Sequence, residues 1–185
     1  MTRRTPTFRA AREGSAWPAG GWRHAAVLAA VVRDGNPSVI LTTRAAHLKH
    51  HPGEVALPGG SLEPSETVEQ AARREMFEET GVHVAASGVV GTLPAVPSPA
   101  GFMVTPVVAW VDRPAAFKLD PQEVQDAFFV PLDDLRAMTP HVERRAVPWG
   151  EEDVYDYRWQ DRRIWGLTAK VIHHLLAAEL PQEGA

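Results

Sequence analysis

Two apolar stretches near the start of the chain predict a β-hairpin. The first, residues 25–32, reads AAVLAAVV, and the second, residues 38–43, reads SVILTT. Between them lies RDGNP (33–37), in which Asp-Gly and Asn-Pro are typical turn sequences. We therefore expect two antiparallel strands joined by a tight connection.

Similar patterns predict the rest of the fold. Strands are expected at 82–93, 102–111, 127–130 and 152–159, with a Pro/Gly-rich connection at 94–101 and a sharp turn at 161–162. Helical segments are expected at 65–80, 131–138 and 165–180. No internal repeat or linker interrupts them. The sequence thus predicts one α+β domain at 23–180, with an N-terminal arm at 1–22 and a C-terminal tail at 181–185.

The helix expected at 65–80 has an unusual distribution of polar residues. Ser65 is expected as its N-cap and Gly81 as its C-terminal stop. At about 100° per residue, Glu75 and Glu79 fall in the middle of the apolar face, and Glu78 falls at its edge. Carboxylates are almost never buried without partners, because a desolvated charge is costly. These acids therefore need an explanation.

Two interpretations account for them. Either the helix is largely solvated and its acids pair with Arg73 and Arg74, or oxygen ligands on one helical face bind a divalent cation. The glycine pair Gly59-Gly60 directly upstream favours the cation, because glycine lets the main chain approach a ligand closely. Mg²⁺ and Mn²⁺ suit such all-oxygen ligation.

Composition excludes several classes of protein. The 23 acidic and 19 basic side chains give a net charge of −4, which argues against nucleic-acid binding by bulk attraction to phosphate. No apolar run approaches the ~18 residues of a membrane span. The absence of cysteine excludes disulfides, thiolate zinc sites and a cysteine nucleophile. We expect a cytoplasmic protein with a small-molecule substrate and neither nucleic acid nor membrane as a partner.

The spacing around the helix resembles the Nudix box. Gly60 is followed after five residues by Glu66, and after seven more by REMFEETGV (74–82). This matches G-x5-E-x7-R-E-U-x-E-E-x-G-U, where U is aliphatic, at all nine specified positions. The resemblance implies Mg²⁺- or Mn²⁺-dependent hydrolysis of a nucleoside diphosphate linked to another moiety. It also implies an α/β/α sandwich in which the box forms a loop–helix–loop beside a mixed sheet.

The resemblance also implies roles for the box residues. By motif position, Glu75, Glu78 and Glu79 are expected to bind the cation, with the carbonyl of Gly60 as an additional ligand. Arg74 is expected to form a salt bridge that orients the acids. Metal ions that bridge carboxylates and phosphate oxygens invert the local field and lower the pKa of a bound water.

Two acids outside this ligand set leave alternatives open. Glu66 either supports the loop or acts as a partner of the helix N-terminus. The attacking water is activated either by a metal-bound hydroxide or by a free carboxylate, such as Glu78. In this superfamily the base often lies on a loop outside the box, where Glu123 is the best candidate. The alternative for Glu123 is a loop carboxylate without a catalytic part.

Residues 40–60 resemble the signature of the coenzyme A diphosphatase subgroup, L-L-T-x-R-[SA]-x3-R-x3-G-x3-F-P-G-G. Ile40, Lys49 and Leu57 replace a Leu, an Arg and a Phe, and the remaining positions agree. Lys49 keeps the charge but loses the two-pronged phosphate geometry of arginine. The resemblance implies cleavage of coenzyme A, and of its acyl or oxidised forms, to 3′,5′-ADP and 4′-phosphopantetheine or its derivative.

The expected substrate-binding residues are Arg44, Lys49, Gly59 and Gly60, since coenzyme A carries a 3′-phosphate besides its pyrophosphate. The alternative for the basic residues is an ordinary solvated strand end. The connection at 94–101 is a candidate border for the pantetheine arm. Other Nudix specificities, such as ADP-ribose or an oxidised nucleotide, and a non-catalytic nucleotide-binding module remain as alternatives. The three tryptophans of the last third fit either a core or the surface of a homodimer.

Overall fold

The computed structural model describes residues 21–178 and 180. The predicted arm at 1–22, apart from Gly21 and Trp22, and the tail at 181–185 lie outside these residues. Within the described part, no helix is long and apolar enough to cross a membrane.

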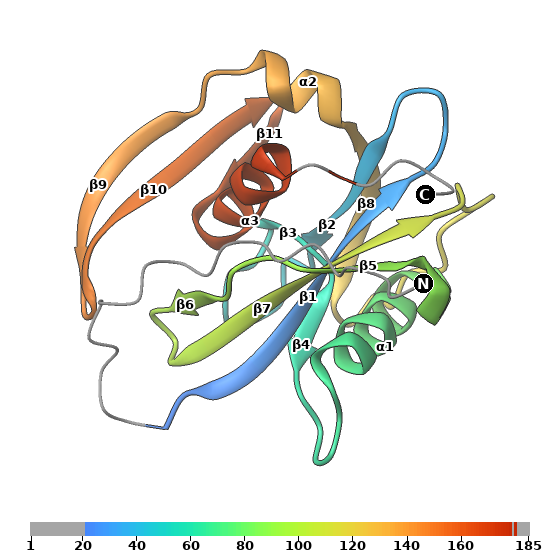
Figure 1. Cartoon of the computed structure of the whole chain (residues 1–185), viewed down its shortest axis with the longest axis horizontal. Helices are drawn as coiled ribbons and strands as arrows, with labels where there is room; N and C mark the ends of the chain where they lie inside the picture. Colours follow the sequence, from blue (N-terminus) through green and yellow to red (C-terminus); the bar gives the residue numbers. More distant parts are fainter. Residues whose placement is uncertain (1–20, 179, 181–185) are drawn as a thin grey trace, which may run out of the picture.

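An eight-stranded mixed sheet forms the centre of the molecule (Figure 1). Strand β1 (Arg23–Val32) runs antiparallel to β2 (Ser38–Arg44) and parallel to β7 (Phe102–Val111). The predicted hairpin is therefore confirmed. The other strands are β3 (Val55–Ala56), β4 (Gly59–Ser61), β5 (Val89–Thr92), β6 (Val96–Ser98) and β8 (Val124–Pro131). Of these, β4 pairs with β1, and β8 pairs with β2.

Helices cover both faces of this sheet. One face packs against α1 (Val68–Thr80), in a core that includes Leu28 from the sheet and Met76 from the helix. The other face packs against α2 (Leu132–Ala137) and α3 (Gly166–Ala177), in a core that includes Val31 and Ile172. The continuous apolar run of β1 supplies both cores, because successive side chains point to opposite faces. The predicted α+β fold with an α/β/α sandwich is confirmed.

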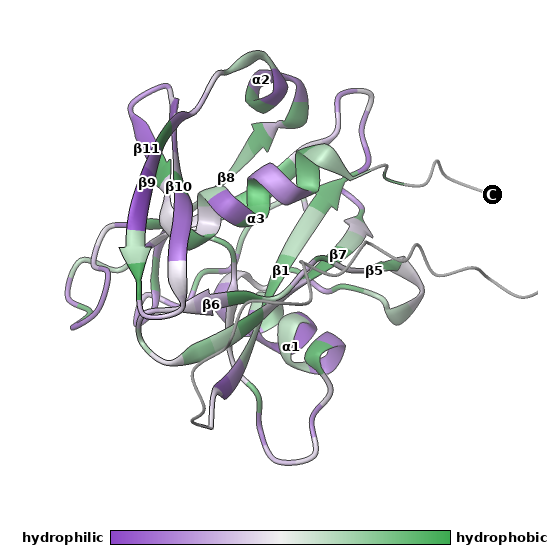
Figure 2. Ribbon diagram, turned by 60° about the vertical axis from the view of Figure 1, so that its left-hand side comes forward, coloured by the Kyte–Doolittle hydropathy of each residue, from purple (hydrophilic) through white to green (hydrophobic). Residues whose placement is uncertain are grey.

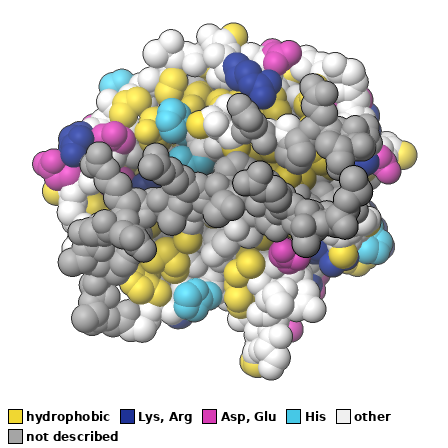
Figure 3. Space-filling view, viewed as in Figure 1, with side chains coloured by type: hydrophobic (Ala, Val, Ile, Leu, Met, Phe, Trp, Pro, Cys, Tyr) yellow, Lys and Arg dark blue, Asp and Glu magenta, His cyan; other side chains and the backbone are white. Residues whose placement is uncertain are grey.

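A smaller sheet lies beside α3. It consists of β9 (His141–Val147), β10 (Gly150–Trp159) and β11 (Arg162–Trp165), in the order β11-β10-β9. Figure 2 shows β9 and β10 as mostly hydrophilic, in contrast to β1 and β7 of the main sheet. The sequence does not predict β9, because nearly all of its residues are exposed and it lacks an apolar face. In the view of Figure 3, the visible Lys and Arg side chains lie apart from one another instead of forming one patch.

Several predicted boundaries are wrong. Helix α1 begins at Val68 with Thr67 as its N-cap, because Thr67 and Gln70 form a reciprocal capping box; Ser65 instead has φ 68° in the preceding loop. The strand predicted at 82–93 is reduced to β5, which follows a short 3₁₀ helix at Ala86–Gly88. Gly81 ends α1 in the left-handed conformation, as predicted.

Candidate metal centre

Three carboxylates from two distant segments meet at one end of the sheet. Glu75 and Glu79 lie on α1, and Glu123 lies immediately before β8. Each offers an oxygen atom, and these three atoms lie within 4.8 Å of one another. The backbone N–H of Asp120 donates to the carbonyl of Glu79 at 3.1 Å, and the N–H of Glu123 donates to the carbonyl of Asp120 at 3.1 Å. The turn at Asp120 therefore attaches Glu123 to the C-terminal part of α1.

The environment of the cluster opposes negative charge. Glu79 is only 4% exposed, and burial raises its pKa to about 8 in spite of a hydrogen bond from the Gly59 N–H at 3.2 Å. Repulsion from Glu123 and Glu75 contributes to the same shift. Burial also raises the pKa of Glu75, against the opposing effect of Arg74. Three oxygen donors of this kind fit a hard divalent cation, which would remove both the repulsion and the burial cost.

The glycine pair of β4 makes this approach possible. A Cβ atom added to Gly60 would lie 2.3 Å from Oε1 of Glu75, and one added to Gly59 would lie 2.3 Å from the carbonyl oxygen of Ala26. At Gly59 the backbone of β1 leaves no room for a side chain, whereas at Gly60 a side chain would displace the Glu75 carboxylate. Glycine at both positions therefore lets β4 lie close to β1 on one side and to the carboxylates on the other.

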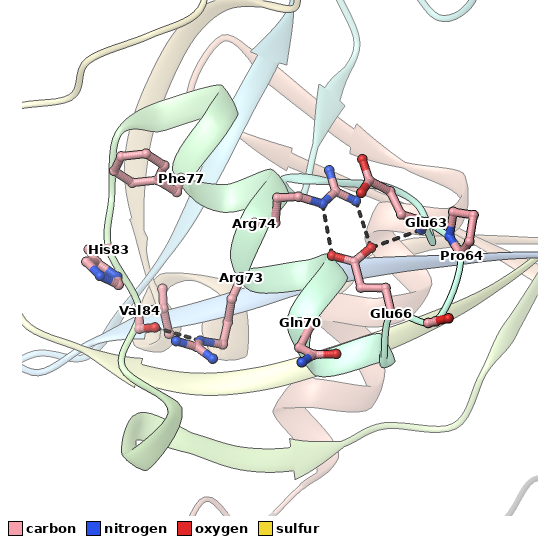
Figure 4. A pocket seen from close by; sticks show the side chains of 10 residues that line it. Glu63, Pro64, Glu66, Gln70, Arg73, Arg74, Phe77, His83 and Val84 are labelled. Atoms are coloured by element: carbon pink, nitrogen blue, oxygen red, sulfur yellow. Dashed lines mark hydrogen bonds and ion pairs between the residues drawn. The ribbon is translucent and has the colours of Figure 1, made fainter.

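Arg74 connects the loop before α1 to the carboxylates. Its Nε donates to Glu66 at 2.9 Å, and its Nη1 donates to Glu75 at 2.8 Å and to Glu78 at 2.9 Å. Arg74 lowers the pKa of Glu66, whose carboxylate also accepts the N–H of Glu63 at 3.0 Å (Figure 4). The salt bridge expected of Arg74 is present, and Glu66 fixes the loop from which α1 starts.

The outer side of α1 has a different character. Phe77, Arg73 and His83 border a groove of about 520 Å³ along α1, which Glu66 and Arg74 also line (Figure 4). Arg73 donates to the carbonyl of Val84 at 2.7 Å, which ties α1 to the segment that follows it. Glu75, Glu79 and Glu123 do not line this groove.

Comparison with known proteins agrees with this geometry. The NUDIX domain family matches residues 22–150, which include β4, α1 and Glu123. The chain belongs to the Nudix family. It is 36% identical over 158 residues to a protein of Pectobacterium atrosepticum named uncharacterized Nudix hydrolase NudL, a match that covers 83% of this chain and 81% of that protein. The protein of the same name from Escherichia coli O6:H1 is 35% identical over 155 residues, with 83% and 81% covered.

Solved Nudix structures share the fold. The Nudix hydrolase RenU of M. smegmatis superposes with a TM-score of 0.51 at 29% identity, over 63% of this chain and 75% of that chain. A MutT/nudix family protein of Enterococcus faecalis gives a TM-score of 0.53 at 18% identity, over 79% and 51% of the two chains, and supports the fold alone. Nudix hydrolases act on pyrophosphate bonds of small nucleotide-type substrates and generally use divalent metal ions.

Within this Nudix site, the cluster contains Glu123 and not Glu78. The Glu78 side chain is 56% exposed and pairs with Arg74, because its position on α1 is at the edge of the inward face. From the sequence, Glu123 is either the catalytic base or a loop carboxylate without a catalytic part. The fold brings it next to two carboxylates of the Nudix box. Asp120, which holds this loop, was missed, although an Asp that precedes a Pro is itself a turn signal.

Arg44 and Lys49 differ in their relation to the Nudix carboxylates. Arg44 ends β2, and its charge opposes the rise in the pKa of Glu79. Its buried Nε has no hydrogen-bond partner among the described residues. The next N–H, that of Ala45, donates to the carbonyl of Glu123 at 2.8 Å. Lys49 is exposed in the following turn, and within the described part of the chain no hydrogen bond or ion pair joins it to the carboxylates.

Proposed function

We propose that this Nudix protein hydrolyses the pyrophosphate bond of coenzyme A, and of its acyl or oxidised derivatives. The products are 3′,5′-ADP and 4′-phosphopantetheine or its derivative. The observation that carries this proposal is the position of Arg44, the arginine of the coenzyme A signature. It lies beside the carboxylate cluster with a buried Nε that has no partner among the described residues. An anionic substrate is the partner that such a group accepts.

Glu75, Glu79 and Glu123 are proposed to hold Mg²⁺ or Mn²⁺, with the Gly60 carbonyl and Glu78 as further ligands. The donor set supports this assignment, because hard cations prefer carboxylate and carbonyl oxygens. When bound, such a cation supplies positive charge to the pyrophosphate and lowers the pKa of the attacking water. Without it, an acidic protein with a charge of −4 would repel an anionic substrate from this site.

Residues of the chain orient the carboxylates and accept a proton. Arg74 orients Glu75 and Glu78 through its two ion pairs. A carboxylate has two oxygens, so Glu123 can contribute one to the cation site and accept the proton of the attacking water on the other. It is the exposed member of the cluster, and Glu78 is the alternative base.

Substrate binding is assigned to the region around β2 and β4. Arg44 and Lys49 bind phosphate groups, including the 3′-phosphate, and Gly59 and Gly60 allow the substrate to approach the main chain. The loop that contains β6, residues 94–101, borders the pantetheine arm.

A substrate panel tests the proposal. The full chain is incubated with Mg²⁺ or Mn²⁺ and, in parallel, with coenzyme A, ADP-ribose, a dinucleoside polyphosphate and an oxidised nucleoside triphosphate. Products are identified by chromatography and mass spectrometry, and hydrolysis in ¹⁸O-labelled water shows which phosphorus is attacked. We expect coenzyme A to have the highest kcat/KM. A preference for another compound refutes the coenzyme A assignment but leaves the hydrolase; no hydrolysis of any compound favours the non-catalytic alternative.

A further inference from the structure

A single guanidinium joins the smaller sheet to the strands that lead into the carboxylate cluster. Arg162, the first residue of β11, donates from Nη1 to Oγ1 of Thr43 at 3.0 Å and from Nη2 to Oδ2 of Asp126 at 2.7 Å. Its guanidinium also lies 3.8 Å from the centre of the Phe128 ring. Thr43 and Asp126 are directly opposed residues of β2 and β8. Arg162 therefore bridges two paired strands from a third.

The bridge stands next to an irregularity in the pairing of β2 and β8. Thr43 is opposite Asp126, but Arg44 is opposite Val124, so that Gln125 is an extra residue. Such a bulge disrupts the ladder and changes the direction in which the neighbouring side chains point. Among the described strands, β8 pairs only with β2 and has no second neighbour to support it.

The residues beyond the bulge belong to the candidate site. On β2 the next residue is Arg44, and the segment that leads into β8 carries Glu123. The N–H of Ala45 reaches the carbonyl of Glu123 at 2.8 Å on the far side of the irregularity. The bridge by Arg162 and this hydrogen bond thus hold the two strand ends from both sides of the bulge.

We propose that Arg162 is a positioning residue, which fixes Glu123 and Arg44 relative to Glu75 and Glu79 and so sets the affinity of the cluster for a divalent cation. This inference rests on the proposed function, because it assumes that the cluster binds a cation. The side chains of Arg162 and Asp126 are 27% and 44% exposed, and pairs of this exposure contribute little to global stability. The loss of the bridge should therefore appear in cation affinity and turnover more than in the free energy of unfolding.

The test compares Arg162→Ala with Arg163→Ala. Arg163 is the next residue of β11; it pairs with Asp156 at 2.8 Å and stacks on Trp165, and both of these partners lie within the smaller sheet. Mn²⁺ affinity is measured without substrate by calorimetry or by electron paramagnetic resonance. We expect R162A to weaken Mn²⁺ binding and to lower kcat by roughly 10-fold or more, the usual effect of groups that orient ligands. We expect R163A to stay within about twofold of the wild type, as surface substitutions do.

A double-mutant cycle separates positioning from a general structural role. In a Glu123→Gln background, R162A should have little further effect on Mn²⁺ affinity, because the group it positions is already impaired. Arg162→Lys should recover part of the affinity, since it restores one donor but not the two-pronged bridge. If R162A does not fold, Thr43→Val and Asp126→Ala remove the two acceptors separately and should each weaken Mn²⁺ binding.

The possible results have distinct meanings. Wild-type affinity in R162A, equal losses in R162A and R163A, or additive losses in the cycle would each overturn the inference. If the wild-type protein itself binds no Mn²⁺, the proposed cation site fails, whatever the variants show. If it binds Mn²⁺ but does not cleave coenzyme A, only the substrate assignment fails, and the comparison of affinities still decides the role of Arg162.

Discussion

Glu79 and Glu152 are both largely shielded from water, but they lie in regions that treat a buried carboxylate differently. Glu152, on β10, has a side chain that is 14% exposed; it pairs with Lys170 of α3 and accepts a hydrogen bond from Trp149 at 2.8 Å. Glu79 is 4% exposed and accepts a hydrogen bond from the Gly59 N–H. No ion pair to it is found within the described residues, and other carboxylates face it.

This difference shows where the protein needs a ligand. In the smaller sheet, the charge of Glu152 is balanced by a residue of the chain itself, so this carboxylate is a structural group. In the cluster, the carboxylates leave an excess of negative charge, and the positive charge that balances it must come from outside the chain. A buried acid indicates a binding site when the fold gives it other acids as neighbours.

The largest expected effect comes from removing the unbalanced charge. Glu79→Gln should reduce metal-dependent hydrolysis by more than about 100-fold, the upper range of losses for groups that only orient ligands. It should also stabilise the metal-free protein, because a costly buried carboxylate is gone. Turnover assays and urea unfolding measure the two effects. Glu69→Gln, on the exposed side of α1, is the control, and equal activity of the two variants would contradict the role of Glu79.

The balanced pair should show the opposite behaviour. Lys170→Met should lower the free energy of unfolding by about 3 kcal/mol, because it leaves Glu152 buried without its cation. The double variant Glu152→Gln/Lys170→Met should regain most of this stability. Urea denaturation of the three proteins gives the comparison, and a single variant as stable as the wild type would show that the pair contributes nothing.

A methyl group at Gly60 tests how closely the cluster is packed. Gly60→Ala places a Cβ where only 2.3 Å separates it from Glu75, so the carboxylate must move. We expect Mn²⁺ affinity to fall by about 10-fold. Gly35→Ala, at a position with open space around it, is the matched control for the loss of a glycine. Unchanged Mn²⁺ affinity in Gly60→Ala would mean that Glu75 is not held by this approach.

The smallest expected effect is the pH dependence of stability that His174 of α3 causes. Burial lowers the pKa of His174 from its ordinary 6.5, with the charges of Lys170 and His173 acting in the same direction. The folded state therefore binds fewer protons at this residue than the unfolded state, and its stability should decline as the pH falls below about 6.5. His174→Gln should decline less between pH 7.5 and pH 5 in urea titrations. Parallel curves for the two proteins would exclude His174 as the cause.

The sequence predicted the parts of the site that are local. Glu75 and Glu79 lie on one face of α1 because four residues make about one helical turn, and this follows from spacing alone. The start of α1 was misplaced, although Thr67 and Gln70 carry a recognisable capping-box spacing. Strand β9 has no apolar periodicity, so its pairing with β10 became visible only in three dimensions.

The rest of the site depends on tertiary structure. Glu123 reaches the cluster because the turn at Asp120 bonds back to the carbonyl of Glu79, a contact between residues 41 positions apart. Arg162 reaches Thr43 across 119 positions. Hydrophobic periodicity carries no information about either contact, since neither is a hydrogen bond of a helix or of a sheet ladder.

The carboxylates of the cluster come from two segments of the chain, and this determines the order in which the site forms during folding. Glu75 and Glu79 come together as soon as α1 forms, whereas Glu123 joins them only when β8 has paired with β2 at the margin of the sheet. A partly folded chain therefore offers an incomplete set of oxygens. A cation that requires all three carboxylates stabilises only the fully folded protein. Cation binding during refolding would therefore report the pairing of β8 with β2.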